Sequence, residues 1–356
     1  MMNLGFASSQ LRLTIAGFVG LFYQGIIIAT PGAFLLQWQN TFGDTVSLGW
    51  YYNLFLLGGL VGLRLASTAQ KRHPLFPIGF ATVAFGFGLT AVSINFLTIT
   101  IAAIFIGLGS GVINLQSNSL IGELHPQRRV VMLNWASAVF GLGALSTPLL
   151  ASFLPWRIAL ILIVIFALFA ISLAWQAPCV LDFSPTDSKM PWGKARILLL
   201  LFFLYVGLES SIGAWNSNYL IKIGWSEAAS GTLLSFYWGS LTLGKAVLGG
   251  WVGRQPVKAL KLLLLCSLAI TGLICIPSLV IILPLAAFFY GPLFGTVIGL
   301  LQERCGHVAL GNLFYAAYFG RTSIPAFFGL LGESAYLPYG YVSLAIILYL
   351  LSLRLK

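Results

Sequence analysis

The chain has 356 residues, of which 59% are hydrophobic and only 8% are charged. Its mean hydropathy is +0.95, whereas soluble domains carry roughly 25% charged residues because water must solvate their surface. These values exclude a water-soluble protein and predict an all-α integral membrane protein. In a membrane protein, a net charge of +11 reflects the excess of basic residues in cytoplasmic loops. It does not indicate binding to nucleic acid, so we expect a lipid bilayer and no nucleic acid as partners.

Apolar segments long enough to cross a membrane recur along the whole chain. A crossing helix needs about 20 apolar residues, and twelve such segments are predicted. They cover approximately residues 12–36, 49–69, 74–93, 96–122, 130–154, 156–175, 196–220, 227–251, 259–277, 278–300, 309–331 and 336–353. The first is interpreted as a true span, because polar residues and Pro31 interrupt it in a way that a signal peptide would not tolerate.

The basic residues predict the orientation. If the N-terminus is cytoplasmic, only Arg157 and Lys222 of the 19 Lys and Arg residues fall in outside joints. Three more, Arg64, Lys245 and Arg321, lie within spans, and the others fall at the inside. Cytoplasmic loops carry such an excess of positive charge. We therefore expect a multi-pass protein of the plasma or inner membrane with both termini in the cytoplasm.

The longest polar joint divides the chain into two sets of six spans. We expect residues 1–175 to form an N-terminal six-helix bundle, 176–195 a central cytoplasmic loop and 196–356 a C-terminal six-helix bundle. Short strings repeat between the halves at offsets that agree to within one residue: Tyr23-Gln24-Gly25 with Tyr205-Val206-Gly207, and Gly58-Gly59-Leu60 ending in Arg64 with Gly239-Ser240-Leu241 ending in Lys245. The fold class predicted is thus twelve transmembrane helices in two pseudo-symmetric six-helix bundles.

Glu209 lies about half-way through the span 196–220. An ionisable group at that depth is costly and usually faces the bundle interior or a water-filled cavity. Tyr205 and Asn216 share its face at helical spacing. We predict that these three residues bind substrate and that Glu209 is the coupling acid. The alternative is a carboxyl group neutralised by burial and hydrogen-bonded to a neighbouring helix.

Arg321 lies near the middle of the span 309–331. Because its guanidinium cannot shed its charge, it should face an anion. Two interpretations stay open: Glu209 pairs with Arg321 structurally, or Arg321 binds a carboxylate or phosphate of the substrate directly.

Two further cations lie within spans. Lys245 shares a helix face with Trp238 and Thr242, and Arg64 is its counterpart in the first half. The long side chain of Arg64 can reach toward the cytoplasmic interface. We predict that Arg64 and Lys245 line a gate rather than contact substrate.

Uncharged hydrogen-bonding residues form stripes on other spans. Asn114 and Asn118 lie on the fourth span and Asn134 on the fifth, while Trp215 and Trp238 lie near polar residues of the second half. Amides and aromatic faces suit a hydroxylated solute, so these five are predicted substrate-binding residues. Contacts between helices are the alternative.

Small residues recur at four-residue spacing in several spans, as in Gly58 with Gly62, Gly107 with Gly111 and Ser240 with Gly244. Such spacing lets two helix backbones approach closely in lipid. We predict packing seams here, with a moving hinge as the alternative.

Three strings resemble the fucose permease-like branch of the major facilitator superfamily. They are Tyr205-x-Gly207-x-Glu209-x-x-x-Gly213-x-Trp215-x-x-x-Tyr219-Leu220; Ser235-Phe236-Tyr237-Trp238-Gly239-Ser240-Leu241-Thr242-Leu243-Gly244-Lys245, similar to S-x-[FY]-W-G-x-L-T-x-G-R; and Gly107-x-Gly109-x-Gly111-x-x-Asn114-x-x-x-Asn118, followed by Asn134. The layout covers the whole chain.

The resemblance implies a carrier of a sugar or related polyol that works by alternating access, commonly coupled to protons, with the substrate near the midplane between the halves. Sugar symporters similar to this branch often carry an acid where this chain has Asn114, so Glu209 is the proton carrier expected here. The superfamily's loop signature after the second span is degraded, with Ser67 in place of its aspartate.

Other function classes fit the sequence less well. An intramembrane enzyme would need a catalytic or metal motif that the chain lacks, so we expect no enzyme activity, cofactor or metal. A channel normally repeats its filter groups in symmetric subunits, whereas we expect a monomer with two degenerate halves. Among carriers, an exporter of lipophilic solutes and an organic-anion carrier using Arg321 remain as alternatives.

Overall fold

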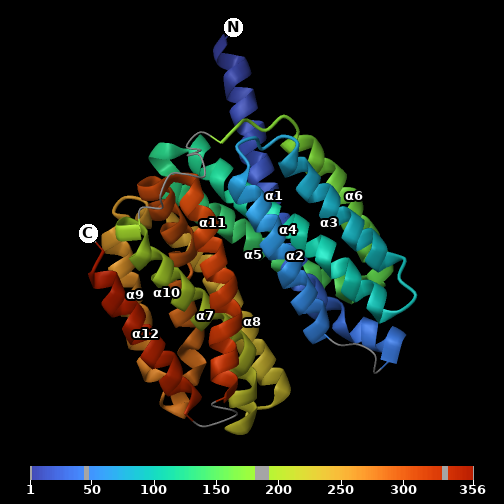
Figure 1. The fold of residues 1–356 in the computed structure, drawn as a ribbon. Helices are drawn as coiled ribbons and strands as arrows, with labels where there is room; N and C mark the ends of the chain where they lie inside the picture. Colours follow the sequence, from blue (N-terminus) through green and yellow to red (C-terminus); the bar gives the residue numbers. More distant parts are fainter. Residues whose placement is uncertain (1, 44–47, 181–191, 331–335, 356) are drawn as a thin grey trace. The chain divides into compact units, whose positions relative to one another are not determined.

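The computed structural model describes residues 2–43, 48–180, 192–330 and 336–355, and every regular element in these ranges is a helix (Figure 1). The helices in chain order are α1 (Met2–Phe42), α2 (Leu48–Thr68), α3 (Leu75–Ala91), α4 (Phe96–Leu124), η2 (Pro126–Arg128), α5 (Arg129–Phe153), α6 (Trp156–Ala174), α7 (Trp192–Lys222), α8 (Glu227–Val252), α9 (Pro256–Leu273), η3 (Pro277–Ile282), α10 (Leu283–Tyr290), α11 (Leu293–Leu330) and α12 (Leu337–Leu353). The all-helical prediction is confirmed. Most of the expected central loop, residues 181–191, lies outside the described ranges.

Seven helical segments in the described part of the chain are long and apolar enough to cross a membrane. They are Gln10–Leu35, Phe96–Leu124, Pro126–Phe153, Trp156–Ala174, Ala195–Asn216, Pro256–Leu273 and Pro277–Gly306. Two shorter helices, Leu75–Ala91 and Leu337–Leu353, are also apolar. The described chain therefore has several helices that could cross a membrane, and the count of twelve crossings stays a prediction.

The expected span 278–300 is not one regular helix. It consists of η3, α10 and the beginning of α11, with a break at Gly291 and Pro292. Proline lacks the amide hydrogen that would continue the helix. α11 then runs through the expected joint after residue 300, and Gly306 turns it with a φ of 72°, a left-handed conformation that favours glycine.

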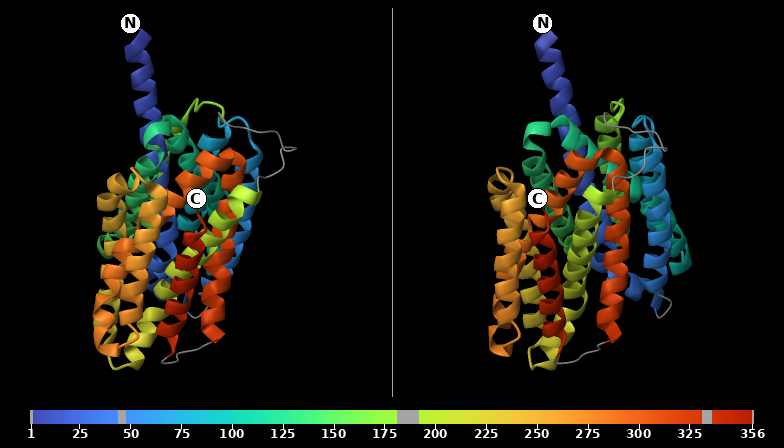
Figure 2. Two further views of the ribbon diagram at one scale, coloured as in Figure 1. Left: turned by 90° about the vertical axis from the view of Figure 1, so that its left-hand side faces the viewer. Right: turned by 60° about the vertical axis from the view of Figure 1, so that its left-hand side comes forward.

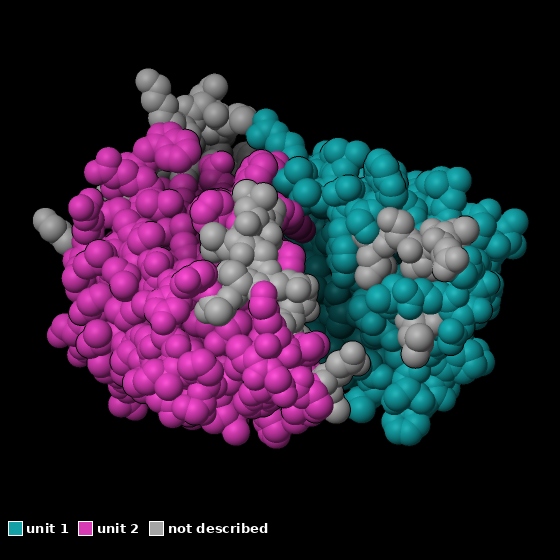
Figure 3. All heavy atoms as spheres, turned by 90° about the horizontal axis from the view of Figure 1, so that it is seen from below, with its two compact units in different colours: residues 1–126, 139–188 teal, residues 127–138, 189–356 magenta. Residues whose placement is uncertain are grey.

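The described chain divides into two compact units, coloured separately in Figure 3. Unit 1 comprises residues 1–126 and 139–188, and unit 2 comprises residues 127–138 and 189–356. The first turns of α5 therefore group with the second half of the chain. The predicted boundaries at 175 and 196 remain predictions.

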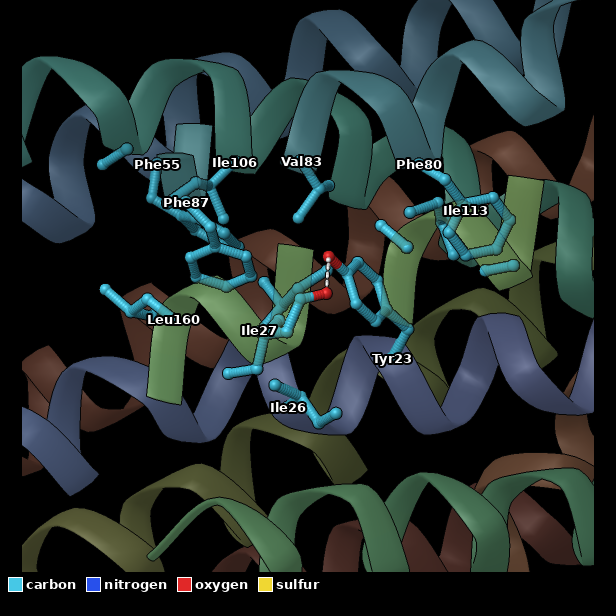
Figure 4. Packing of buried hydrophobic residues seen from close by; sticks show 14 of the residues in the cluster. Tyr23, Ile26, Ile27, Phe55, Phe80, Val83, Phe87, Ile106, Ile113 and Leu160 are labelled. Atoms are coloured by element: carbon cyan, nitrogen blue, oxygen red, sulfur yellow. Dashed lines mark hydrogen bonds between the residues drawn. The ribbon is translucent and has the colours of Figure 1, made fainter. Parts of the chain in front are cut away.

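Unit 1 has an aromatic core between α1, α3 and α6 (Figure 4). The Tyr23 ring of α1 is fully buried against Phe80 and Phe87 of α3, with ring centroids 5.8 and 6.4 Å away. Its hydroxyl donates a hydrogen bond to the carbonyl oxygen of Ile163 on α6, at 3.3 Å. The phenol therefore joins three helices while its polar atom is satisfied.

Glycines make the close seams that the four-residue spacings predict. Gly58 and Gly62 of α2 face the backbone of α4, and Gly107 and Gly111 of α4 face the backbone of α2. A Cβ atom at any of the four would collide with main-chain atoms of the other helix. The prediction of a packing seam is confirmed for α2 and α4.

Equivalent seams occur in unit 2, whose helices can be followed from two further directions in Figure 2. Gly244 of α8 faces the backbone at Phe288 of α10, as Gly62 of α2 faces α4. Gly207 and Gly320 join α7 to α11, as Gly25 joins α1 to α5. The two units thus use matching helix pairs, which supports the internal repeat found in the sequence.

Candidate functional site

The predicted residues of unit 2 gather around Glu209 on α7. The Glu209 side chain is half-buried, and its carboxylate acts electrostatically on the buried phenols of Tyr205, one turn earlier, and Tyr237 on α8. It also acts on the Lys245 ammonium, two turns after Tyr237. The face of α7 predicted from helical spacing therefore meets the face of α8 that carries the lysine.

Two buried polar groups of this cluster have no hydrogen bond among the described residues: the hydroxyl group of Tyr237 and the amide nitrogen of Asn216. The buried Tyr205 hydroxyl interacts with the Glu209 side chain, although without a hydrogen bond of good geometry. A buried polar group that stays unpaired costs about 1–3 kcal/mol. Such groups are expected where another molecule completes the hydrogen bonds.

Lys245 is nearly fully buried, with 4% of its surface exposed. Its nitrogen lies 5.8 Å from the centre of the Phe294 ring, within cation–π range. Arg321 of α11 acts electrostatically on the same ammonium, and the Arg321 side chain is exposed. The buried ammonium on α8 thus interacts electrostatically with a carboxylate of α7 and with a cation of α11.

The two predicted tryptophans differ in their contacts. The indole N–H of Trp215 donates a hydrogen bond to the carbonyl oxygen of Pro325 at 2.9 Å, which joins α7 to α11. Trp238 packs edge-on against Tyr237 at 5.3 Å and keeps an exposed surface. The Trp215 side chain therefore holds α7 and α11 together. The Trp238 ring, next to Tyr237 in the chain, is partly exposed.

Asn134 lies in the first turns of α5, which belong to unit 2. Its amide nitrogen donates to the hydroxyl of Thr296 on α11 at 3.2 Å and to the carbonyl oxygen of Val130 at 2.9 Å. Gly249 of α8 and Gly295 of α11 leave room for it, because a Cβ atom at either would lie 2.8 Å from Asn134 atoms. Its amide oxygen is buried and unpaired.

In unit 1 the predicted residues form separate groups. The Asn118 amide donates to the backbone and side-chain oxygens of Asn114, at 2.8 and 3.0 Å. Arg64 is exposed near the end of α2. The sequence did not predict the buried pair Gln24 and Ser110, whose side chains lie 2.7 Å apart; the available signal was a polar residue within each of two apolar spans.

A second group that sequence reasoning missed lies at the C-terminal end of α4. Arg72 forms a fully buried ion pair with Glu123 at 2.7 Å and donates to the Ser119 hydroxyl at 2.8 Å. Its other terminal nitrogen donates to the carbonyl oxygen of Cys179 at 3.1 Å. The loop after α2 is therefore fastened to α4 and to residues 178–179, although the loop signature there is degraded.

Two histidines of unit 1 make defined contacts. His125, the C-cap of α4, lies 2.9 Å from the Thr14 hydroxyl, and burial lowers the pKa of its imidazole. His73 packs against Trp175 at 4.8 Å and accepts a hydrogen bond from the Gln176 backbone. Both rings therefore join separate segments of unit 1.

The sequence profile of the Major Facilitator Superfamily matches residues 13–330. The chain belongs to this superfamily. The match covers most of the protein and includes both units, so the resemblance inferred from three short strings is confirmed at the level of the superfamily. No curated protein sequence matches the chain significantly.

Solved transporters of the superfamily have similar folds. The fucose transporter FucP in its outward conformation has a TM-score of 0.81 and 15% identity, over 98% of this chain and 99% of that one. The human organic anion transporter TETRAN has a TM-score of 0.74 and 17% identity, over 96% and 99%. The proton:xylose symporter XylE has a TM-score of 0.72 and 14% identity, over 98% and 96%. At sequence identities this low, the structural similarity shows the fold alone.

This superfamily protein is an integral membrane transporter and not an enzyme. The cluster around Glu209 combines a carboxylate, a buried hydroxyl and a buried amide nitrogen without hydrogen bonds among the described residues, and two cations. Polar and charged groups at this depth in a membrane protein are candidates for a transport site.

Proposed function

We propose that this transporter is a secondary-active carrier of a small hydroxylated solute, most simply a sugar or polyol, that works by alternating access. In the same proposal the chain crosses the membrane twelve times as two six-helix halves, with both termini in the cytoplasm. The matching glycine seams of the two units support the repeat. The similarity in fold to a fucose transporter and a xylose symporter supports the substrate class.

One observation carries the proposal: unpaired polar atoms surround a carboxylate in the middle of an apolar helix. Tyr237 and Asn216 each keep a buried donor without a hydrogen bond among the described residues, and the Tyr205 hydroxyl interacts with the Glu209 side chain. Sugar hydroxyl groups both donate and accept, so they would complete these bonds. The exposed Trp238 surface would stack against the apolar face of a ring. A lipophilic solute would leave the same donors unsatisfied.

Glu209 is the coupling acid in this proposal. When ionised, it faces Lys245, Tyr205 and Tyr237; when protonated, it would release the lysine. Protonation therefore changes the charge of the cluster by one unit, and it couples to binding if the substrate prefers one of the two forms. Asn114, Asn118 and Asn134 are proposed to contact the solute in one state of the cycle, and Arg64 and Lys245 to line the gate.

The test is counterflow in proteoliposomes with a panel of labelled monosaccharides. Exchange needs a binding site but no imposed gradient, so saturable exchange identifies a carrier. We expect Glu209→Gln to keep exchange and to lose accumulation driven by a pH gradient. Glu303→Gln, at an exposed acid of α11, is the matched control and should keep both. Proton-driven accumulation in Glu209→Gln would refute the coupling role.

A further inference from the structure

The Trp238 ring of α8 lies against α7 at Gly213. A Cβ atom added to Gly213 would lie 2.8 Å from Cζ2 of the indole and 3.6 Å from Cη2. Glu209 lies one turn before Gly213 and Asn216 one turn after it, so the three share a face of α7. The ring therefore meets α7 between an acid and an amide, and the amide nitrogen is buried without a hydrogen bond in the described chain.

The face of α8 that carries Trp238 is turned toward protein. The indole is 37% exposed and packs edge-on against Tyr237. Lys245 and Gly249 follow two and three turns later on the same face. Both are buried, and a Cβ atom at Gly249 would lie 2.8 Å from the Cβ atom of Asn134. A face with a buried cation is turned to the helix bundle and away from lipid, so a solute can reach the exposed part of the ring from the interior side.

We infer that Gly213 and Trp238 together select cyclic sugars over acyclic polyols. The inference rests on the proposed function and narrows its substrate class. One face of a pyranose ring presents C–H groups, which pack on an aromatic face, while the hydroxyl groups at its edge reach the acid and the amide on either side. A polyol chain has many rotatable bonds and loses their freedom when it lies flat on the indole. The cyclic form therefore gains more from the same contact.

Gly213 sets the position of the indole. The atoms nearest to its missing Cβ belong to the far end of the Trp238 side chain and not to a backbone. An alanine would therefore displace the indole and leave α7 and α8 in place. The seam between α2 and α4 differs, because there an added Cβ atom would collide with main-chain atoms. We therefore expect Gly213→Ala to change selectivity without loss of stability.

The experiment compares solutes that differ in ring closure. Galactitol and sorbitol are the reduced, open-chain forms of galactose and glucose. Half-saturation concentrations for counterflow are measured in proteoliposomes. We expect the unchanged protein to prefer the sugar of a pair by about three- to tenfold, the scale of one aromatic contact. Gly213→Ala and Trp238→Leu should each lose most of that preference, because the sugar binds more weakly while the polyol is little affected.

A double variant separates this role from a general loss of structure. Because Gly213 acts through the indole, Gly213→Ala should add nothing in a Trp238→Leu protein, so the two changes are non-additive. Gly250→Ala is the matched control on α8, where nothing lies within 4 Å of the added atom, and it should keep the preference. Additive losses in the double variant, or an equal loss of sugar and polyol exchange in folded Gly213→Ala, would overturn the inference.

A measurement on the unchanged protein needs no variant. The sugar of a pair should raise the thermal unfolding temperature of the detergent-solubilised protein at lower concentration than its polyol does. Equal affinity for sugar and polyol, or a preference for the polyol, overturns the inference while the proposed carrier function stands. If no solute of either pair exchanges or stabilises folded protein, both fail.

Discussion

Arg72 illustrates how one residue can hold several segments of a membrane protein together. Its guanidinium contacts the Glu123 carboxylate, the Ser119 hydroxyl and the carbonyl oxygen of Cys179. The Ser119 hydroxyl in turn donates to the same carboxylate at 2.9 Å. Breaking a buried pair by removing one partner leaves an uncompensated charge and typically costs about 3–5 kcal/mol, whereas removing both partners costs much less.

We therefore expect Arg72→Gln to destabilise the protein strongly and Arg72→Gln/Glu123→Gln to be closer to the unchanged protein. The measurement is the thermal unfolding temperature in detergent. Arg254→Gln, at an exposed arginine before α9, is the control and should have little effect. Equal unfolding temperatures for Arg72→Gln and the unchanged protein would show that the ion pair does not stabilise unit 1.

Lys245 shows why a residue's depth in a span does not reveal its partner. The sequence predicted a gate-lining cation, and the structure places its ammonium among Glu209, Phe294 and Arg321. The counterpart in the repeat, Arg64, is exposed and has no such surroundings. Equivalent positions in the two halves therefore have different environments, and their gate roles stay predictions.

At the scale of elements, glycine seams set the distances between helices. α2 and α4 touch along Gly58, Gly62, Gly107 and Gly111, with main-chain atoms where side chains would otherwise lie. Without a strong hydrophobic force between helices in lipid, such contacts supply van der Waals packing. A single added methyl group must therefore separate the helices.

Gly62→Ala should lower the unfolding temperature, because its Cβ atom would collide with the Leu108 backbone; overpacking of this kind costs about 1–3 kcal/mol. Gly88→Ala is the matched control on α3, where nothing lies within 4 Å of the added atom. It should be neutral or stabilising, since alanine favours a helix over glycine by about 0.5–1 kcal/mol. The same loss in both variants would mean that the seam has no special role.

At the scale of the whole molecule, the two units do not coincide with the two halves of the sequence. Residues 127–138 of α5 belong to unit 2, where Asn134 bonds to Thr296 and packs against Gly249 and Gly295. The first turns of α5 therefore group with unit 2 and the rest of that helix groups with unit 1.

The predicted orientation can be tested with cysteines. Cys179 is exposed near the expected central cytoplasmic loop, and Ile94, 86% exposed, lies in an expected outside joint. A membrane-impermeant maleimide should label Cys179 in inside-out vesicles and not in right-side-out ones. The variant Cys179→Ser/Ile94→Cys should show the opposite pattern. Reversed labelling would mean that the termini lie outside.

Hydropathy, charge and short sequence strings were enough to predict a helical membrane transporter of this superfamily. They also selected Glu209, Tyr205 and Asn216 as candidate site residues. These features are local in the chain: twenty apolar residues span a bilayer whatever their neighbours, and residues at helical spacing share a face. Gly291 and Pro292 also mark the helix break in the sequence, but they stand within a continuous apolar segment, which was predicted to be one span.

Only the tertiary structure decided which faces meet. It buried Lys245 within electrostatic reach of Glu209, paired Arg72 with Glu123 and grouped the start of α5 with unit 2. The physical reason is that such contacts depend on the rotation and crossing of packed helices. A one-dimensional pattern records which side of a helix is polar, but not which other helix that side faces.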